Sequence, residues 1–496
     1  MADPDGDFLA LPLHPCADAA LGAAEAAGAT WADVRITRDH QRSVSLRDGR
    51  VDSTSRDASV GIGVRVIADG AWGFAASGEV TVEDAAQAAR RAVAMARSVA
   101  PLGRADVILA DEPVYNGIWV APYQTDPIDV ADSDVIDLLA GWSAVMASHR
   151  LVRHTKASFD AAKEALYYAD SAGTRTIQQR VRCQPEATAI AVTDDGFEDM
   201  RTLGAPTARG WEYALEPMWS DDVAELGEHL AARVAAPTVP AGPYDLVIAP
   251  SNLWLTIHES VGHATEYDRA IGFEANYAGT SFATPDLLGH LQYGSPLMHI
   301  TGDRTAEFGL ATAAWDHEGV AAQSWDIVRG GRLVGYQLDR WGAAQIGLPR
   351  SNGCAYADDS AHVQIQRMPN VSLQPATAGP SVEALVGGVT DGLLVVGDKS
   401  WSIDMNRRNF QFTAQRFYRI RNGTLVGQVK DIAYQSDTLT FWNSLVALGG
   451  PQSYVLGGAL NCGKGQPGQV AAVSHGCPAA VFEQVNVLQT GAGGVR

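Results

Sequence analysis

The sequence predicts an α+β protein with two domains, each of mixed helices and mainly antiparallel sheet. Alternating apolar segments are joined by tight glycine turns, the pattern of antiparallel strands. Amphipathic helical patterns interrupt these strands in both halves, which is typical of α+β folds. A Pro- and Gly-rich stretch at 235–243 reads as a linker and places the boundary near residue 240. We therefore expect domains at 1–240 and 241–496.

The N-terminal half begins with an Ala-rich helix and continues into strands. Asp48-Gly49 and Asp69-Gly70 lie between alternating segments, which predicts two hairpins. Thr81 precedes an apolar 3.6-residue period, with acidic residues in the first turn, and so predicts a helix cap. The segment 150–200 has the pattern of an antiparallel meander. The expected helices cover residues 15–28, 80–100, 131–149 and 219–236.

The C-terminal half is richer in strands. The segment 244–250 (YDLVIAP) has the pattern of a buried strand. Hairpins are expected at Gly330-Gly331 and Asn422-Gly423, and one further helix at 381–388. This domain contains the residues with the clearest chemical signal.

Composition excludes several classes of protein. The 496 residues include 37 Lys+Arg and 57 Asp+Glu, a formal charge of −20 that disfavours nucleic acid and anionic lipid as partners. The sequence has no run of about 18 apolar residues, so no membrane span is expected. The acidic N-terminus lacks the features of a signal peptide, and five cysteines do not form a disulfide framework. These features favour a soluble, reduced, cytoplasmic protein.

The segment 251–270 has a pattern suited to metal chemistry. It follows a strand, starts at the good capping pair Ser251-Asn252, and contains His258, Glu259 and His263. Imidazoles hold zinc, and a neighbouring carboxylate takes a proton from the attacking water. The pattern predicts a zinc site with Glu259 as the base.

The histidine spacing sets a structural condition on this site. Ligands four residues apart face one metal, whereas His258 and His263 are five apart, about 140° around an ideal helix. They converge if the helix gains a residue, as in a π-bulge, or ends in that turn. Gly262 permits either backbone, so we expect an irregular helix there.

A catalytic zinc needs a third protein ligand, and the candidates lie near the C-terminal end. Cys462 sits in a Gly-rich loop beside Lys464, a cation that would favour the thiolate. His475 and Cys477 are rival ligands. Glu266, one turn beyond His263, is either a hydrogen-bond partner of that histidine or a solvated carboxylate.

Two other segments attract attention. Asp316-His317-Glu318 resembles a second metal dyad, but a structural or substrate-lining role is favoured. Arg367 is expected in an internal ion pair, with contact to a substrate carbonyl or carboxylate as the alternative.

Several motifs together resemble the TldD/PmbA family of metallopeptidases. They are HESVGHATE, EANYAGTSFATPDLLG, DHEGVAAQSWDIVRGGRLVGYQLDR, QRMPNVSLQP and CGKGQPGQVAAVSHGCP, with SVGIGVRVIADGAWGFAAS as a weaker N-terminal match. The resemblance covers nearly the whole chain. It implies a TldD-type, metal-bearing subunit that binds zinc through His258, His263 and Cys462, with Glu259 as acid and base. It also implies a homodimer or a heterodimer with a TldE (PmbA)-type subunit.

Three functions are consistent with these patterns. The leading one is a zinc endopeptidase that cleaves unfolded or flexible peptides in an enclosed site. A non-catalytic regulatory partner, as in the family's old designation as modulators of DNA gyrase, is the second. A metal-dependent amidase acting on a small peptide-like molecule is the third.

Overall fold

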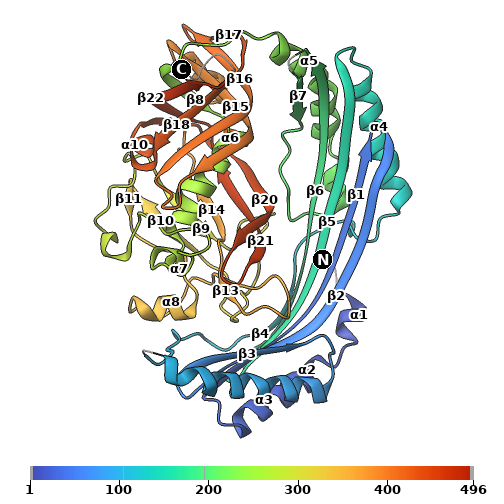
Figure 1. Cartoon of the computed structure of the whole chain (residues 1–496), viewed down its shortest axis with the longest axis vertical. Coiled ribbons are helices and arrows are strands. Elements are labelled where there is room, and N and C mark those ends of the chain that lie inside the picture. The colour runs from blue at the N-terminus through green and yellow to red at the C-terminus, as the bar shows by residue number, and fades with distance from the viewer. Residues whose placement is uncertain (1–3, 104, 195, 492–496) are drawn as a thin grey trace.

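The computed structural model describes residues 4–103, 105–194 and 196–491. It confirms the α+β class, with mainly antiparallel sheets in both halves. Figure 1 shows a long, curved sheet from the N-terminal half that runs alongside the C-terminal half. Across the described residues, no helix is long and apolar enough to span a bilayer.

The N-terminal sheet has the order β3-β2-β1-β5-β6-β4, with β7 paired to β6. Its neighbours are antiparallel except β4 and β6, which are parallel. The expected turns at Asp48-Gly49 and Asp69-Gly70 are confirmed, with positive φ at all four residues. The strands are β1 Trp31–Arg47, β2 Arg50–Ala68, β3 Ala71–Ser77, β4 Asn116–Val120, β5 Val152–Asp170, β6 Arg175–Thr193 and β7 Gly196–Arg201.

Helices cover two separate parts of this sheet. Helices α2 and α3 pack on each other and on β1 to β3, while α4 and α5 pack near β5 to β7. The Thr81 cap is confirmed, because its hydroxyl accepts a hydrogen bond from the Asp84 amide at 3.1 Å. The helices are α1 Gly6–Leu9, α2 Leu13–Ala26, α3 Val82–Val99, η1 Ala100–Leu102, α4 Asp132–Ala147, η2 Trp211–Leu215 and α5 Pro217–Ala235.

The large C-terminal sheet has the order β15-β8-β22-β18-β16-β17, with β19 paired to β22. Strand β8 is the segment expected to be buried, and it runs parallel to β15. Strand β15 also pairs with β16. The strands are β8 Gly242–Ile248, β15 Asp391–Ile403, β16 Asn409–Arg421, β17 Thr424–Val429, β18 Ile432–Asp437, β19 Leu445–Leu448 and β22 Ala480–Gln489. Helix α6 follows β8 and packs on β15.

A smaller sheet, of order β11-β10-β9-β14, and two hairpins complete this half. The hairpin β20–β21 packs on β14 and α6. The strands are β9 Ile300–Asp303, β10 Ser324–Arg329, β11 Arg332–Leu333, β12 Ala355–Tyr356, β13 Ile365–Gln366, β14 Asn370–Leu373, β20 Val455–Lys464 and β21 Gln469–Cys477. The helices are α6 Pro250–Ile257, η3 His258–Gly262, η4 His263–Thr265, α7 Tyr267–Ala270, η5 Pro285–Leu287, α8 Arg340–Gln345, α9 Val382–Gly387, α10 Thr438–Asn443 and η6 Pro451–Ser453.

Buried ionic groups join the two halves. Arg65 in β2 lies 2.7 Å from a carboxylate oxygen of Asp33 and 2.9 Å from one of Glu318. Nearby, His317 Nε2 lies 3.6 Å from Glu164 in β5. Burial lowers the pKa of His317 to about 4, so this imidazole is neutral at pH 7. The structural role favoured for Asp316-His317-Glu318 agrees with these contacts.

Candidate metal centre

Helix α6 leads from strand β8 directly to the candidate site. The expected cap at Ser251-Asn252 is wrong, because the helix begins at Pro250 and its cap residue Ala249 makes no side-chain hydrogen bond. The Ser251 hydroxyl instead accepts from the Gly397 amide at 3.0 Å. Asn252 donates to the Gly397 carbonyl at 3.0 Å. Both side chains therefore fasten the helix to β15 and fix the direction in which it enters the site.

The predicted helix irregularity is confirmed. A π-helical turn, η3, covers His258–Gly262, and a 3₁₀ turn, η4, follows at His263–Thr265. The wider turn holds one extra residue, so histidines five apart lie on one face. Their ring centroids are 4.6 Å apart.

Gly262 is needed for a different reason from the one expected. Its φ of −51° and ψ of −64° are ordinary helical values, so its backbone does not require glycine. A β-carbon there would lie 2.6 Å from the Met368 sulfur and 3.5 Å from Cε1 of His475. The constraint is therefore close packing of the helix against Met368, just before β14, and against β21.

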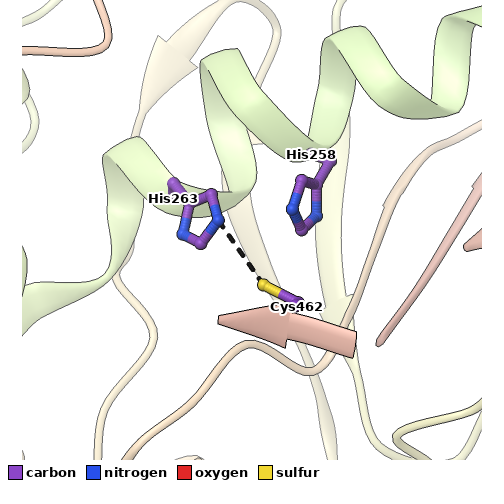
Figure 2. A group of neighbouring side chains, drawn as sticks. All are labelled: His258, His263 and Cys462. Carbon is purple, nitrogen blue, oxygen red and sulfur yellow. Dashed lines mark hydrogen bonds between the residues drawn. The ribbon is translucent and has the colours of Figure 1, made fainter. Parts of the chain in front are cut away.

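The fold brings His258, His263 and Cys462 together, although Cys462 lies 199 residues beyond His263. Figure 2 shows both imidazoles pointing from the helix toward the cysteine on β20. One ligand atom from each residue lies within 4.8 Å of the other two. The rival Cys477 instead places its sulfur 3.7 Å from the Pro250 carbonyl oxygen.

This donor set fits zinc. Sγ of Cys462 lies 3.5 Å from Nε2 of His263. Tetrahedral zinc, with bonds of about 2.3 Å to sulfur and about 2.0–2.1 Å to nitrogen, separates two such ligand atoms by about 3.5 Å. Two imidazoles and one thiolate also leave a fourth position for water or substrate.

His475 is not a third ligand but a partner of His258. Its Nδ1 lies 2.8 Å from the Val371 carbonyl oxygen, which can only accept, so the hydrogen-bond network assigns the proton to Nδ1. Its Nε2 then accepts from Nδ1 of His258 at 2.8 Å. Nε2 of His258 is left unprotonated and ready to bind a metal.

Glu266 orients His263 in the same way. Its carboxylate accepts from Nδ1 of His263 at 2.8 Å, which leaves Nε2 unprotonated toward Cys462. Burial alone would raise the pKa of Glu266, but the Lys464 ammonium and His263 together hold it well below its usual value. Burial lowers the pKa of His263 to about 3, against the opposing charge of Glu266. Burial also lowers the pKa of His258 well below its usual value, so His258 and His263 are both neutral at pH 7.

Lys464 acts on Cys462 in the expected direction, lowering the pKa of the thiol, but burial outweighs this effect. Burial raises the pKa of the Cys462 thiol to about 11, and the nearby cations do not outweigh it. Lys464 is itself fully buried and pairs with Glu266 at 3.1 Å and Asp268 at 2.7 Å. Lys464 thus holds the carboxylate that orients His263, and does not ionise the thiol.

Arg367 also departs from expectation. It was expected in an ion pair, but its guanidinium donates to the Cys462 carbonyl at 2.7 Å and the Gln469 carbonyl at 3.3 Å. These bonds tie β20 to β21 next to the cysteine. Its role is to hold the hairpin in place.

Glu259 is buried, with 6% of its surface exposed, and it lies outside the group of three ligand candidates. Nη1 of Arg407 donates to its carboxylate at 2.5 Å. Burial raises the pKa of Glu259, and the positive charge of Arg407 opposes that rise. A carboxylate beside a metal site but outside the ligand set is suited to acid–base chemistry.

Arg407 is the site residue that the sequence did not reveal. It lies in the turn between β15 and β16, a segment to which no role was assigned from the sequence. Nothing in its local sequence points to a helix almost 150 residues earlier. Only the folded hairpin brings its side chain to Glu259.

A cavity of about 700 Å³ separates the long N-terminal sheet from the β20–β21 hairpin. The hairpin side of its lining includes Leu460 and Asn461, the residues just before Cys462. The sheet side includes Arg42, Lys163 and Arg182. Each of these cations pairs with a carboxylate, at 2.6 Å, 2.8 Å and 3.4 Å respectively.

Comparison with known proteins gives relatives across most of the chain. The chain is 23% identical over 421 residues to metalloprotease MJ0996 of Methanocaldococcus jannaschii, covering 83% of this chain and 89% of that protein. It is 22% identical over 431 residues to a zinc metalloprotease TldD homolog of Saccharolobus solfataricus, covering 85% and 89%.

The fold has a solved counterpart. The structure of TldE from Thermococcus kodakarensis superposes with a TM-score of 0.70 at 14% identity, covering 95% of this chain and 99% of that one. Residues 241–489 match the family model of the PmbA/TldA metallopeptidase C-terminal domain. Residues 32–96 match that of PmbA/TldA metallopeptidase domain 1. The chain therefore belongs to the TldD/PmbA family of metallopeptidases.

Proposed function

We propose that this protein is a zinc-dependent endopeptidase that cleaves unfolded or flexible peptides. The observation that supports this most is the convergence of His258, His263 and Cys462 on one point, with Glu259 buried in the same π-helical turn as His258. The similarity to a protein named a zinc metalloprotease agrees with this metal. We propose His258, His263 and Cys462 as the zinc ligands.

Bound zinc would supply a Lewis acid that polarises the scissile carbonyl and acidifies the attacking water. Glu259 accepts the proton of that water and passes it to the leaving amine. His475 and Glu266 hold the two imidazoles in the tautomer that presents Nε2. The thiolate of Cys462 donates more charge than a third imidazole, so we expect modest turnover.

An extended peptide suits the surroundings of the site. In the described part of the chain, β20 pairs only with β21, which leaves its other edge for backbone hydrogen bonds to a peptide. The cavity beside Leu460 and Asn461 has room for side chains of such a peptide. Backbone pairing gives loose sequence specificity, as degradation of flexible chains requires.

We further propose that the active form is a dimer, either of this chain or with a TldE-type subunit. The likeness to the TldE fold supports the second form. Light scattering of the chain alone, and mixed with a TldE-type protein, tests this. A fully active monomer would contradict it.

Metal analysis combined with a peptide assay tests the function. The purified chain should contain about one zinc ion per site and cleave an unfolded protein. The cleavage assay is run with and without a TldE-type partner. Chelation should abolish cleavage, and added zinc should restore it. A zinc-loaded chain that cleaves no peptide in either setting would contradict the peptidase and favour a regulatory role.

A further inference from the structure

We propose that Arg407 is a further catalytic residue, whose guanidinium donates hydrogen bonds to the carbonyl oxygen of the scissile peptide bond. This inference rests on the proposed peptidase function. In this role Arg407 stabilises the negative charge that develops on that oxygen, while Glu259 takes the proton of the attacking water.

The fold fixes the backbone around Arg407 from two directions. The Thr280 amide donates to the Met405 carbonyl at 2.9 Å, and the Thr438 hydroxyl donates to the Arg407 carbonyl at 2.8 Å. Arg407 itself has a φ of 62°, a left-handed value that costs a non-glycine residue energy. Strain held in place by surrounding hydrogen bonds is typical of functional positions.

The side chain then reaches inward to the site. It is 13% exposed, and its Nη1 lies 2.5 Å from Glu259 Oε2. The neighbouring Arg408 turns outward instead, and pairs with Asp437 while 41% of its side chain stays exposed. Two adjacent arginines on one hairpin tip therefore have different surroundings, and only Arg407 faces the proposed base.

The Arg407 guanidinium has an N–H donor that is not used within the described residues. Its Nε is buried and has no hydrogen-bond partner within the described residues. A buried donor without a partner costs about 1–3 kcal/mol, and a substrate carbonyl oxygen would satisfy it. A guanidinium presents its N–H groups in a fixed planar fork, so one edge can stay on Glu259 while another meets the substrate.

The reaction balances without a proton from Arg407. The water oxygen bonds to the carbonyl carbon, the π electrons of that carbonyl move to its oxygen, and Glu259 takes the water proton. Collapse reforms the carbonyl and breaks the C–N bond, and the amine nitrogen takes the proton from Glu259. Burial lowers the pKa of Arg407 and the Glu259 carboxylate opposes this, but a guanidinium keeps its proton in proteins, so Arg407 stays protonated throughout.

Steady-state cleavage of one unfolded peptide by the zinc-loaded protein tests the role. Arg407→Ala should lower kcat by about 100- to 1,000-fold, as loss of a donor to the developing oxyanion does in other hydrolases, with KM changed by less than about threefold. Arg407→Lys should fall between this variant and wild type. Arg408→Ala, the matched control, should stay within about twofold of wild type.

Chemical rescue separates catalysis from packing. Guanidinium ion at millimolar concentration should restore part of the lost kcat of Arg407→Ala. It should not raise the kcat of Glu259→Gln. Zinc content and the circular dichroism spectrum of each variant should match wild type. If Arg407→Ala does not fold, Arg407→Lys decides the test. A kcat of Arg407→Lys equal to that of wild type would then overturn the proposed role.

Two further results would overturn the proposal. One is an Arg407→Ala variant with a kcat within threefold of wild type. The other is a wild-type protein that cuts only peptides with a free C-terminal carboxylate and spares amidated ones, because Arg407 would then anchor that carboxylate. A zinc-loaded wild type that cuts no peptide at all would overturn the peptidase function together with this role.

Discussion

Nδ1 of His258 lies 2.8 Å from Nε2 of His475, although 217 residues separate them in the chain. The contact gives His475 a defined part in the site, because it sets which nitrogen of His258 is unprotonated. The metal centre thus depends on β21 as much as on the helix that contains both histidines of the motif.

His475→Ala should weaken zinc binding by about 10- to 100-fold, the usual cost of losing a partner that orients a metal ligand. His475→Gln keeps an acceptor for the Nδ1 proton of His258 and should recover most of the affinity. Competition with a chromogenic chelator measures both. Equal affinity in the alanine variant and wild type would refute the tautomer argument.

Cys462→Ser should lose zinc or bind it far more weakly, because a serine hydroxyl is a poor substitute for a thiolate. Cys477→Ser should keep full zinc content, since its sulfur lies against the Pro250 carbonyl oxygen. Zinc analysis after gel filtration distinguishes them. If zinc content follows Cys477 instead, our ligand assignment is wrong.

Glu259→Gln should retain zinc and lose hydrolysis by at least about 100-fold. The amide fills the same space but cannot accept a proton. Zinc analysis and a peptide assay on the same sample provide the measurement. Near wild-type cleavage would remove Glu259 from the role of base.

Gly262→Ala should reduce the free energy of unfolding by about 1–3 kcal/mol and weaken zinc binding, because its β-carbon would press on Met368 and approach His475. Gly463→Ala is the matched control. No atom lies within 4 Å of a β-carbon there, so stability should be nearly unchanged. Urea unfolding of the two variants and wild type gives the comparison.

His317 should make stability depend on acid pH. Its pKa is lowered to about 4 by burial, whereas a histidine in the unfolded chain has a pKa of about 6.5. Below pH 6.5 the unfolded state binds a proton that the folded state does not. The contribution of His317 to the free energy of unfolding is therefore fully present above pH 6.5 and is lost as the pH falls toward 4.

The size of this effect can be isolated with His317→Asn, since asparagine can still accept from the Ala357 amide that now donates to Nδ1 at 3.2 Å. Between pH 7 and pH 4, the stability advantage of wild type over this variant should shrink by about 3 kcal/mol. Urea unfolding at several pH values measures it. A constant difference would contradict the burial effect.

Local patterns in the sequence were enough to predict much of the fold. Turn residues such as Asp48-Gly49 and caps such as Thr81 act over four residues or fewer, so their structural effect can be read directly from sequence. The widening of the helix at His258–Gly262 is one of the two irregularities that the five-residue spacing of the histidines predicted, so it too could be anticipated from local sequence. These features depend on neighbours in the chain.

The remainder depended on contacts between distant segments. Packing of distant segments buries Cys462, which raises the pKa of its thiol, and places acidic residues around Lys464. The ionisation of the thiol therefore could not be judged from Lys464 alone. Arg407 reaches Glu259 only because β15 and β16 pair and their tip is held against Thr280 and Thr438. Sequence determined which groups could bind a metal, whereas long-range packing decided which atoms each of them faces.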